Sequence, residues 1–312
     1  MQIRWKYIFG VLLLITALIW IAVVSSPDSN LHLVACDVGQ GDAILAIYGN
    51  IQILTDGGPD NKVLDCLSTY MPFYDREIEL VVLTHPQADH YAGLIEVFRR
   101  YKVDTFLANS VDASTQGYEV LKKEVGGSGA KIINPTSGMV IRVGLIQLDI
   151  IHPADELLTD KLITVESSNE KGVLGVFTTK RDLNDFSIVA ILSLRDFDAL
   201  LTGDIGPPLV NEIAEELALR PKAEWEYLKV PHHGSKNGLT SELLDAVSPQ
   251  IAVISVGKNN RYGHPHEETL KLLSDPPAGG DIKILRTDLP SQADEEGDIK
   301  IVTNGKKWWV GD

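Results

Sequence analysis

Three side chains in the stretch LTHPQADHYAGL have the types and spacing of metal ligands. His85 stands four residues before Asp89, and His90 follows directly. Imidazole nitrogens and a carboxylate oxygen, with no thiolate among them, suit zinc, manganese or iron. Such an ion lowers the pKa of a bound water, so that hydroxide is available for hydrolysis at neutral pH. The spacing therefore predicts a hydrolytic metal site, in which Gln87 is a neutral side chain at a position where a further ligand would fit.

Similar side chains recur later in the chain, each time after an apolar run. Asp204 closes DALLTGD, the pair His232-His233 follows EWEYLKV, and His264 and His266 follow QIAVISVG. Taken singly, each is explained as a polar cap at a strand end. Ligand sites in layered α/β folds, however, form where the carboxyl ends of strands meet. Six of the eight histidines lie in three such loops, and this joint pattern favours metal binding.

The elements that must position these loops are short strands alternating with helices. Hydrophobic alternation starts at Leu31, and no break large enough for a second domain follows it. Helices are expected near 61–71, 91–101, 115–125, 208–219, 240–246 and 267–274. Residues 153–183 are polar and predict a long loop or an inserted hairpin. The expected architecture is two packed sheets with helices outside, within one domain over 31–312.

The N-terminus differs from the rest of the chain. Residues 8–24 form a charge-free apolar run, about the shortest length that spans a bilayer as a helix. Arg4 and Lys6 precede the run, so residues 1–7 are expected in the cytoplasm. Residues 25–30 read as a polar linker. The expected location is the cytoplasmic membrane, single-pass, with the body on the extracytoplasmic side; the alternative is secretion after cleavage of a signal peptide.

Charge and cysteine content limit the possible partners. The net charge of −15 excludes a general nucleic-acid surface, so phosphate binding would need local positive charge or metal ions. Four basic residues flank the histidine loops and could supply that charge: Lys229, Lys236, Lys258 and Arg261. Cys36 and Cys66 make no zinc-ribbon spacing. In an exported body they could form a disulfide, and two packed thiols are an equally good reading.

Several motifs resemble those of the metallo-β-lactamase superfamily. HPQADHYAGL looks like its histidine-rich loop, LTDGG like its aspartate-glycine turn, and LLTGD like its bridging-aspartate strand. Together with CDVGQGDA, NDFSIVAIL, KVPHHGSKNG and SVGKNNRYGHPH, they resemble the extracellular domain of ComEC-type DNA-uptake proteins. The resemblance covers nearly all of 31–310 and implies an α/β fold, a four-layer αββα sandwich of two mixed sheets. The multi-helix channel of those proteins has no counterpart here, so a DNA-uptake channel is an expected partner.

The resemblance also implies roles for single residues. His85 falls on the first histidine of the loop and Gln87 on the second, while Asp89 and His90 fall on the pair that serves a second metal. Asp204 would bridge the metals. His232 is favoured over His233 to complete the second site. The family's third-motif histidine has no obvious match, and Asp185 or, less well, His152 could serve. Asp56 looks like the aspartate that supports a ligand by hydrogen bonding.

On this basis the substrate-side residues are expected in the last loops. Asp89 and His264 are the expected catalytic side chains, with His264 or His266 protonating the leaving oxygen. Lys236, Asn259 and Tyr262 would position the substrate.

The expected cofactor is a divalent metal, with zinc the first choice and manganese the second. Because an amide oxygen binds such ions more weakly than imidazole does, one tight ion is expected at Asp89, His90, Asp204 and His232, and a weak or absent ion near His85. The predicted function is a membrane-anchored phosphodiesterase or nuclease. The alternatives are a hydrolase of a small ester, lactone or amide, and a non-catalytic accessory in DNA uptake.

Overall fold

The computed structural model describes residues 5–24, 28–154, 174–176, 178–220, 225–277, 279–289 and 297–311. Its body contains two sheets, one of eight strands in the order β15-β14-β1-β2-β3-β4-β5-β6 and one of seven in the order β13-β12-β11-β10-β9-β8-β7. The strands of the first sheet are β1 (Leu31–Ala35), β2 (Ile44–Tyr48), β3 (Ile51–Thr55), β4 (Glu77–Leu83), β5 (Lys102–Ala108), β6 (Lys131–Ile133), β14 (Ile299–Thr303) and β15 (Trp308–Val310). Those of the second are β7 (Val140–Val143), β8 (Ile146–His152), β9 (Val189–Leu194), β10 (Phe197–Leu201), β11 (Trp225–Lys229), β12 (Pro249–Ile254) and β13 (Lys283–Arg286).

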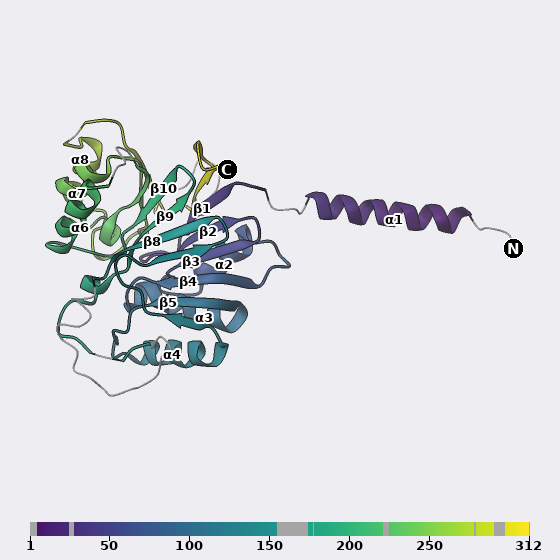
Figure 1. Cartoon of the computed structure of the whole chain (residues 1–312), viewed down its shortest axis with the longest axis horizontal. Helices are drawn as coiled ribbons and strands as arrows, with labels where there is room; N and C mark the ends of the chain where they lie inside the picture. The colour runs from purple at the N-terminus through teal and green to yellow at the C-terminus, as the bar shows by residue number, and fades with distance from the viewer. Residues whose placement is uncertain are drawn as a thin grey trace.

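Helices cover the outer face of each sheet (Figure 1). On the first sheet lie α2 (Lys62–Tyr70), α3 (Ala88–Arg100) and α4 (Gln116–Ser128). On the second lie α6 (Leu209–Ala218), α7 (Ser241–Val247) and α8 (Glu267–Ser274). Each set buries its apolar stripe against its own sheet, for example Leu94 of α3 beside Leu83, and Leu243 of α7 beside Leu228.

A third apolar cluster joins the two sheets. Leu33 and Leu80 of the first sheet pack in it with Ala199 and Val253 of the second. The layers are therefore helix, sheet, sheet, helix, with both sheets of mixed direction. This is the αββα arrangement expected from the motifs, and it rests on strands whose residues are buried on both faces.

The strand directions decide where the polar loops meet. β4 pairs in parallel with β3 and β5, while β10, β11 and β12 run parallel to one another. Crossovers through helices connect the parallel strands, so their carboxyl ends lie at one edge of each sheet. The two edges are brought together by the sheet-sheet core, and the loops that follow β4, β10, β11 and β12 converge there.

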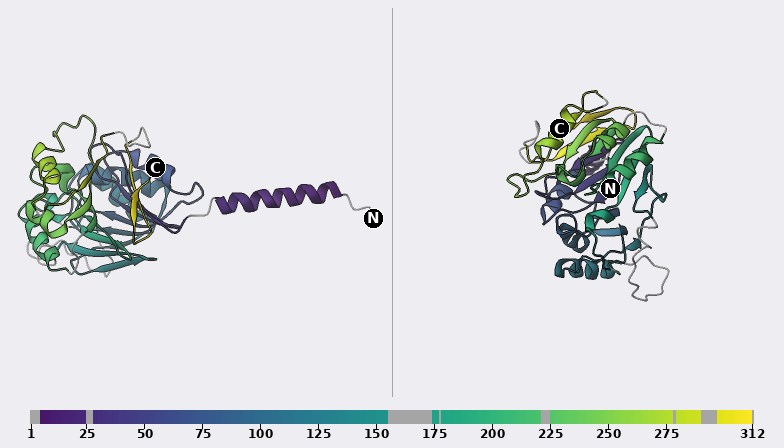
Figure 2. Two further views of the ribbon diagram at one scale, coloured as in Figure 1. Left: turned by 90° about the horizontal axis from the view of Figure 1, so that it is seen from above. Right: turned by 90° about the vertical axis from the view of Figure 1, so that its left-hand side faces the viewer.

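Helix α1 (Trp5–Val24) stands clear of both sheets in Figures 1 and 2. It begins three residues before the apolar run expected at 8–24. Within the part of the chain that the structure describes, no helix meets the length and apolarity needed to cross a membrane. The expected transmembrane anchor is thus not confirmed. Residues 1–4 of the expected cytoplasmic start, 25–27 of the linker, and 155–173 and 177 of the expected long loop lie outside the described residues.

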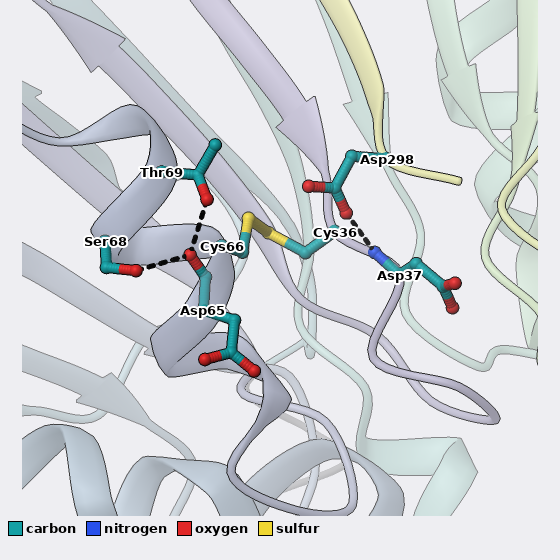
Figure 3. Close-up of a disulfide and its surroundings, with 7 residues drawn as sticks. All are labelled: Cys36, Asp37, Asp65, Cys66, Ser68, Thr69 and Asp298. Carbon is teal, nitrogen blue, oxygen red and sulfur yellow. Dashed lines mark hydrogen bonds between the residues drawn. A yellow bond between two sulfur atoms is a disulfide. The ribbon is translucent and has the colours of Figure 1, made fainter. Parts of the chain in front are cut away.

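A disulfide joins the end of β1 to α2 (Figure 3). Cys36 and Cys66 are both buried, with their Cα atoms 5.9 Å apart. The backbone amide of Cys36 donates to the carbonyl of Ala43, which closes the loop of residues 37–42. Asp298 also holds this loop by accepting a hydrogen bond from the Asp37 amide. The question left open by the sequence is therefore answered in favour of the disulfide.

Candidate metal centre

The loop after β4 delivers its polar side chains at the start of a helix. Helix α3 begins at Ala88, and Gln87 is its N-cap, so Asp89 and His90 stand in its first turn. His90 is fully buried, whereas the Asp89 side chain is 29% exposed. The positive end of the helix dipole favours a carboxylate at this position. Asp89 thus lies on the solvent side of the site, and His90 lies on its buried side.

Asp56 orients His90 from behind. Its Oδ2 lies 2.8 Å from His90 Nδ1 and accepts a hydrogen bond from Thr84 Oγ1, while its Oδ1 accepts from the Thr84 amide. Once the ring is neutral, a ring nitrogen that donates to a carboxylate leaves the lone pair of the other nitrogen, Nε2, available to a metal ion. Asp56 therefore has the contacts of the supporting carboxylate expected from the sequence.

Asp204 and His233 complete the group. His233 Nε2 lies 3.1 Å from Asp204 Oδ2, and His90 Nε2 lies 3.3 Å from the same oxygen. His233 Nδ1 is 3.0 Å from the carbonyl oxygen of Ser255, to which it donates. Ligand atoms of Asp89, His90, Asp204 and His233 all lie within 4.8 Å of one another. Four side chains from three loops thus present two imidazole nitrogens and two carboxylates to one point.

The preference for His232 over His233 differs from this geometry. Both residues adopt left-handed backbone angles, with φ of 50° and 52° in the short turn η2 (Pro231–Gly234). The turn directs the His233 ring into the group and leaves His232 half-buried against His264, with ring centroids 5.8 Å apart. Two consecutive non-glycine residues with positive φ are strained, and such strain is found at functional sites. The structure therefore brings His233, not His232, beside Asp204.

His85 lies beside the group, and no described carboxylate forms an ion pair with it. It is fully buried, its ring centroid is 4.1 Å from that of His90, and its Nδ1 contacts the Thr84 hydroxyl. Burial and the neighbouring His90 lower the pKa of His85 to about 3, so its ring is neutral at pH 7. Beside it, Gln87 Nε2 donates to Asn184 Oδ1 over 2.7 Å. The expected first site thus has one imidazole and an amide that is already bonded elsewhere.

Neither candidate for the third motif joins the group. His152, at the end of β8, is buried and donates through Nδ1 to the Ser187 carbonyl, 2.7 Å away. Burial lowers the pKa of His152 to about 4. Asp185 is half-buried in the turn η1 (Leu183–Phe186), and burial together with Asp182 raises its pKa. The metal-ligand groups of the described residues include neither side chain.

A buried ion pair that was not predicted from the sequence lies behind the group. Lys229, at the end of β11, is 1% exposed, and its Nζ lies 2.5 Å from Asp42 Oδ2 and 3.8 Å from Asp204 Oδ1. Asp42 also approaches His233 Nδ1 at 3.5 Å. It lies next to Gly41, where a Cβ would collide with the backbone oxygen of Asp89. The ammonium expected to attract phosphate from the surface is an internal counter-ion.

Two sequence features indicated this pair: a lysine ends an apolar strand, and an aspartate ends a Gly-Gln-Gly-Asp turn. Both were visible in the sequence, yet neither points to a partner 187 positions away without the fold.

The charges of the group balance closely. Burial alone would lower the pKa of His90 and His233, but the Asp204 carboxylate, with Asp56 for His90 and Asp42 for His233, raises both well above the usual value. Burial would raise the pKa of Asp204, but His233 and His90 hold it well below its usual range. Without a metal, the two imidazoles are therefore cations beside carboxylates.

The donor set fits a divalent metal ion. Among the described side chains, His85 Nε2, His90 Nε2, His233 Nε2 and Asp204 Oδ1 are buried and have no hydrogen-bond partner. Buried polar atoms without partners are rare in native proteins, and an absent ion is one explanation. Nitrogen and carboxylate donors without thiolates suit zinc or manganese. The residues present thus match the cofactor expected from the sequence.

The loop after β12 borders this group on the solvent side. His264 stacks with His233 at 6.4 Å between centroids and with Tyr262 at 5.7 Å, and His266 lies edge-on to it at 4.9 Å. Burial and the three nearby histidines lower the pKa of His264 to about 4. The acid role expected of His264 stays a prediction.

The other expected substrate residues are on the surface. Lys236 and Asn259 are exposed, and Asn259 has a positive φ of 57°. Lys236 lies next to the histidine turn, and its backbone amide donates to His266 Nδ1.

Fold and site together are those of the metallo-β-lactamase class of proteins, a metallo-hydrolase superfamily, with a candidate metal site. The family model described as the metallo-beta-lactamase superfamily matches residues 36–258, and the chain belongs to this superfamily. Within it, the resemblance to ComEC-type competence proteins is confirmed.

Three known proteins illustrate the likeness. The chain is 26% identical over 213 residues to ComE operon protein 3 of Bacillus subtilis, covering 68% of this chain and 24% of the relative. It is 24% identical over 269 residues to Recombination protein 2 of Haemophilus influenzae, covering 85% of this chain and 29% of the relative. The solved metallo-beta-lactamase fold protein YhfI from Bacillus subtilis has 13% identity and a TM-score of 0.48, covering 90% of this chain and all of that one. The chain thus spans less than a third of each of the two curated relatives.

Proposed function

We propose that this protein is a metal-dependent phosphodiesterase that cuts nucleic acid. The observation that carries the proposal is the group of Asp89, His90, Asp204 and His233, whose ligand atoms lie within 4.8 Å of one another. In the described part of the chain, Nε2 of His90 and of His233 is buried without a hydrogen-bond partner. A divalent ion at this point would supply an activated hydroxide and stabilise charge on the phosphate. The likeness to competence proteins supports a nucleic-acid substrate, and a DNA-uptake channel is the partner that it suggests.

The residues of the group would have different roles around that ion. His90 and His233 would hold it through Nε2, each fixed by its Nδ1 contact to Asp56 or to the Ser255 carbonyl. Asp204 would contribute a carboxylate whose charge Lys229 partly balances from behind. Asp89, the most exposed member, lies nearest the solvent, where substrate must enter. One tight ion is expected, because near His85 the Gln87 amide nitrogen is bonded to Asn184.

The disulfide supports a location outside the cytoplasm. Disulfides such as Cys36–Cys66 persist in oxidising compartments and are rare in the cytosol. We therefore propose that the folded body works on the extracytoplasmic side. Thiol alkylation of intact cells, followed by mass analysis, would find both cysteines protected; free thiols in the folded protein would overturn this location.

The function is tested on the purified full chain. Bound metal is measured by elemental analysis, and cleavage of single-stranded DNA, double-stranded DNA and bis-p-nitrophenyl phosphate is measured with and without a chelator. His233→Ala is expected to lose the metal and the activity, while His232→Ala keeps most of the metal. His32→Ala is the matched control, since His32, near the start of β1, contacts Asp28 and lies in no ligand group of the described residues.

Three outcomes would count against the proposal. Activity on acyl esters but not on phosphodiesters would favour the small-ester hydrolase. A wild-type protein that holds no metal and cuts nothing would favour the non-catalytic accessory. Cleavage that survives both chelation and His233→Ala would remove the metal group from the mechanism.

A further inference from the structure

Tyr262 is an exposed aromatic ring placed on a column of rings that ends at the metal group. Its side chain is 59% exposed. One face lies on His264, at 5.7 Å between centroids and 27° between planes. His264 in turn lies 6.4 Å from His233 at 28°. An unbroken column of aromatic rings therefore leads from solvent to a member of the metal group.

The loop that carries this ring is held on three sides. Asn260 donates through Nδ2 to the carbonyls of Gly257 and His264 and accepts at Oδ1 from the His264 amide. The Gly257 amide donates to Gln40 Oε1 in the loop before β2. These bonds join the backbone of the loop to itself and to the first sheet.

The third attachment is to the histidine turn. The His266 amide donates to the Gly234 carbonyl, and His266 Nδ1 accepts from the Lys236 amide. Gly234 lies so close to Pro265 that an added Cβ would approach the proline Cβ at 2.6 Å. A ring on a loop fixed in this way is preorganised, so binding to it costs little ordering of the protein.

Charge around the ring fits an anionic ligand that carries flat groups. Lys258 and Arg261, on either side of Asn259 and Asn260 in the same loop, are exposed, and Lys236 is exposed on the adjacent turn. These cations offset locally the net charge of −15 that would repel a polyanion. Exposed aromatic rings beside cations are the usual platform for unpaired bases, because every base has a π-face to stack.

We propose that Tyr262 stacks on a nucleobase of a single-stranded nucleic acid and so positions the neighbouring phosphodiester at the metal group. This inference rests on the proposed nuclease function and names the form of substrate. A paired base inside a duplex has no free face for such stacking, so single strands and unpaired ends are the preferred substrates. Tyr262 is on this view a substrate-binding residue, and it has no part in holding the ion.

The test compares three variants of the full chain on three substrates. Tyr262→Ala removes the ring, Tyr262→Phe keeps its faces, and Tyr74→Ala removes a 53% exposed ring in the loop before β4, at the opposite end of that strand from His85. The substrates are a single-stranded oligonucleotide, the same oligonucleotide with abasic sites around the scissile phosphate, and bis-p-nitrophenyl phosphate, which has no nucleobase.

Tyr262→Ala is expected to raise KM for the intact oligonucleotide about 5- to 150-fold, since base stacking on an aromatic ring contributes roughly 1–3 kcal/mol. Metal content should stay unchanged. Tyr262→Phe and Tyr74→Ala should behave as wild type. On the abasic oligonucleotide the effect of Tyr262→Ala should vanish.

The outcomes distinguish a failure of the stacking role from a failure of the proposed nuclease function. If the wild type cleaves DNA but Tyr262→Ala leaves KM for the intact strand unchanged, the stacking role is wrong and the nuclease function stands. An equal loss on abasic and intact strands would also reject stacking. If the wild type cleaves neither DNA nor bis-p-nitrophenyl phosphate, the nuclease function itself fails.

Discussion

The amide nitrogen of Gln87 lies 2.7 Å from Oδ1 of Asn184, and this hydrogen bond joins the loop after β4 to the turn η1. The backbone amide of Asn184 donates a hydrogen bond to Asp182 Oδ1, which fixes the position of Asn184. Gln87 is therefore a link between two loops at the position where a second imidazole would extend the metal centre. The neighbouring His85 keeps a buried Nε2 without a hydrogen-bond partner in the described part of the chain. The first site is thus incomplete in its ligands.

Replacing Gln87 by histidine should restore a ligand beside His85. We expect Gln87→His to raise the metal content of the purified protein towards two ions per chain, because imidazole binds zinc-like ions more strongly than an amide oxygen does. Elemental analysis after dialysis measures the change. Gln87→Ala, which also breaks the bond to Asn184 but adds no ligand, is the control. Equal metal content in all three proteins would show that the glutamine is not what limits the first site.

Metal binding should release protons. His90 and His233 have raised pKa values in the metal-free protein, because Asp204 and a second carboxylate overcome the effect of burial. Both rings are then protonated at pH 7, and an ion can bind Nε2 only after the proton leaves. We expect zinc affinity to fall as the pH falls from 8 to 6. Calorimetric titration in two buffers of different ionisation enthalpy counts the protons, and a value of zero would contradict this charge state.

The same shift makes a prediction for the metal-free protein alone. A raised folded-state pKa contributes stability that is complete below the unfolded value of 6.5 and is lost as the pH rises through the folded-state pKa. The stability contributed by His90 and His233 should therefore decline above neutral pH when metal is absent. Added zinc should reverse the decline, since it binds the deprotonated rings. Thermal unfolding at pH 6 and pH 9, with and without zinc, measures both effects.

Much of the site could be predicted because its residues follow apolar strands. Asp204 follows β10, and the histidine turn follows β11. Because these two strands are parallel neighbours, their polar residues meet at the same edge of the sheet. The choice between His232 and His233 could not be predicted in this way. The choice depends on a turn in which both histidines adopt a positive φ, and a positive φ cannot be predicted from the histidine residue type.

Contacts between residues far apart in the sequence could not be predicted either. Cys36 and Cys66 are 30 positions apart, and only the packing of α2 on β1 brings their sulfurs together. Lys229 appeared to be one more basic residue near the histidines. Its burial depends on Asp42, which reaches it from the other sheet.

Breaking the disulfide should destabilise the loop that carries Asp42. Cys36 and Cys66 enclose 30 positions, and closing a loop of this length stabilises the folded state by about 3–4 kcal/mol in the chain-entropy model. We expect the Cys36→Ser, Cys66→Ser double variant to lose about this much in urea unfolding. Wild-type protein treated with reductant should lose a similar amount. If the reduced protein is as stable as the oxidised one, the bridge does not contribute to stability.

Removing the buried ammonium of Lys229 should lower the free energy of unfolding more than removing a surface ammonium does. Lys229→Met leaves Asp42 buried without its closest cation, and breaking one half of a buried pair costs about 3–5 kcal/mol. Lys258→Met, at an exposed position in the loop after β12, should change the unfolding free energy by less than about 0.5 kcal/mol. The double variant Lys229→Met, Asp42→Asn should recover part of the loss, because it leaves no unpaired charge. If Lys229→Met is as stable as Lys258→Met, the pair is not the internal counter-ion of the metal group, and Asp204 must be balanced by His90 and His233 alone.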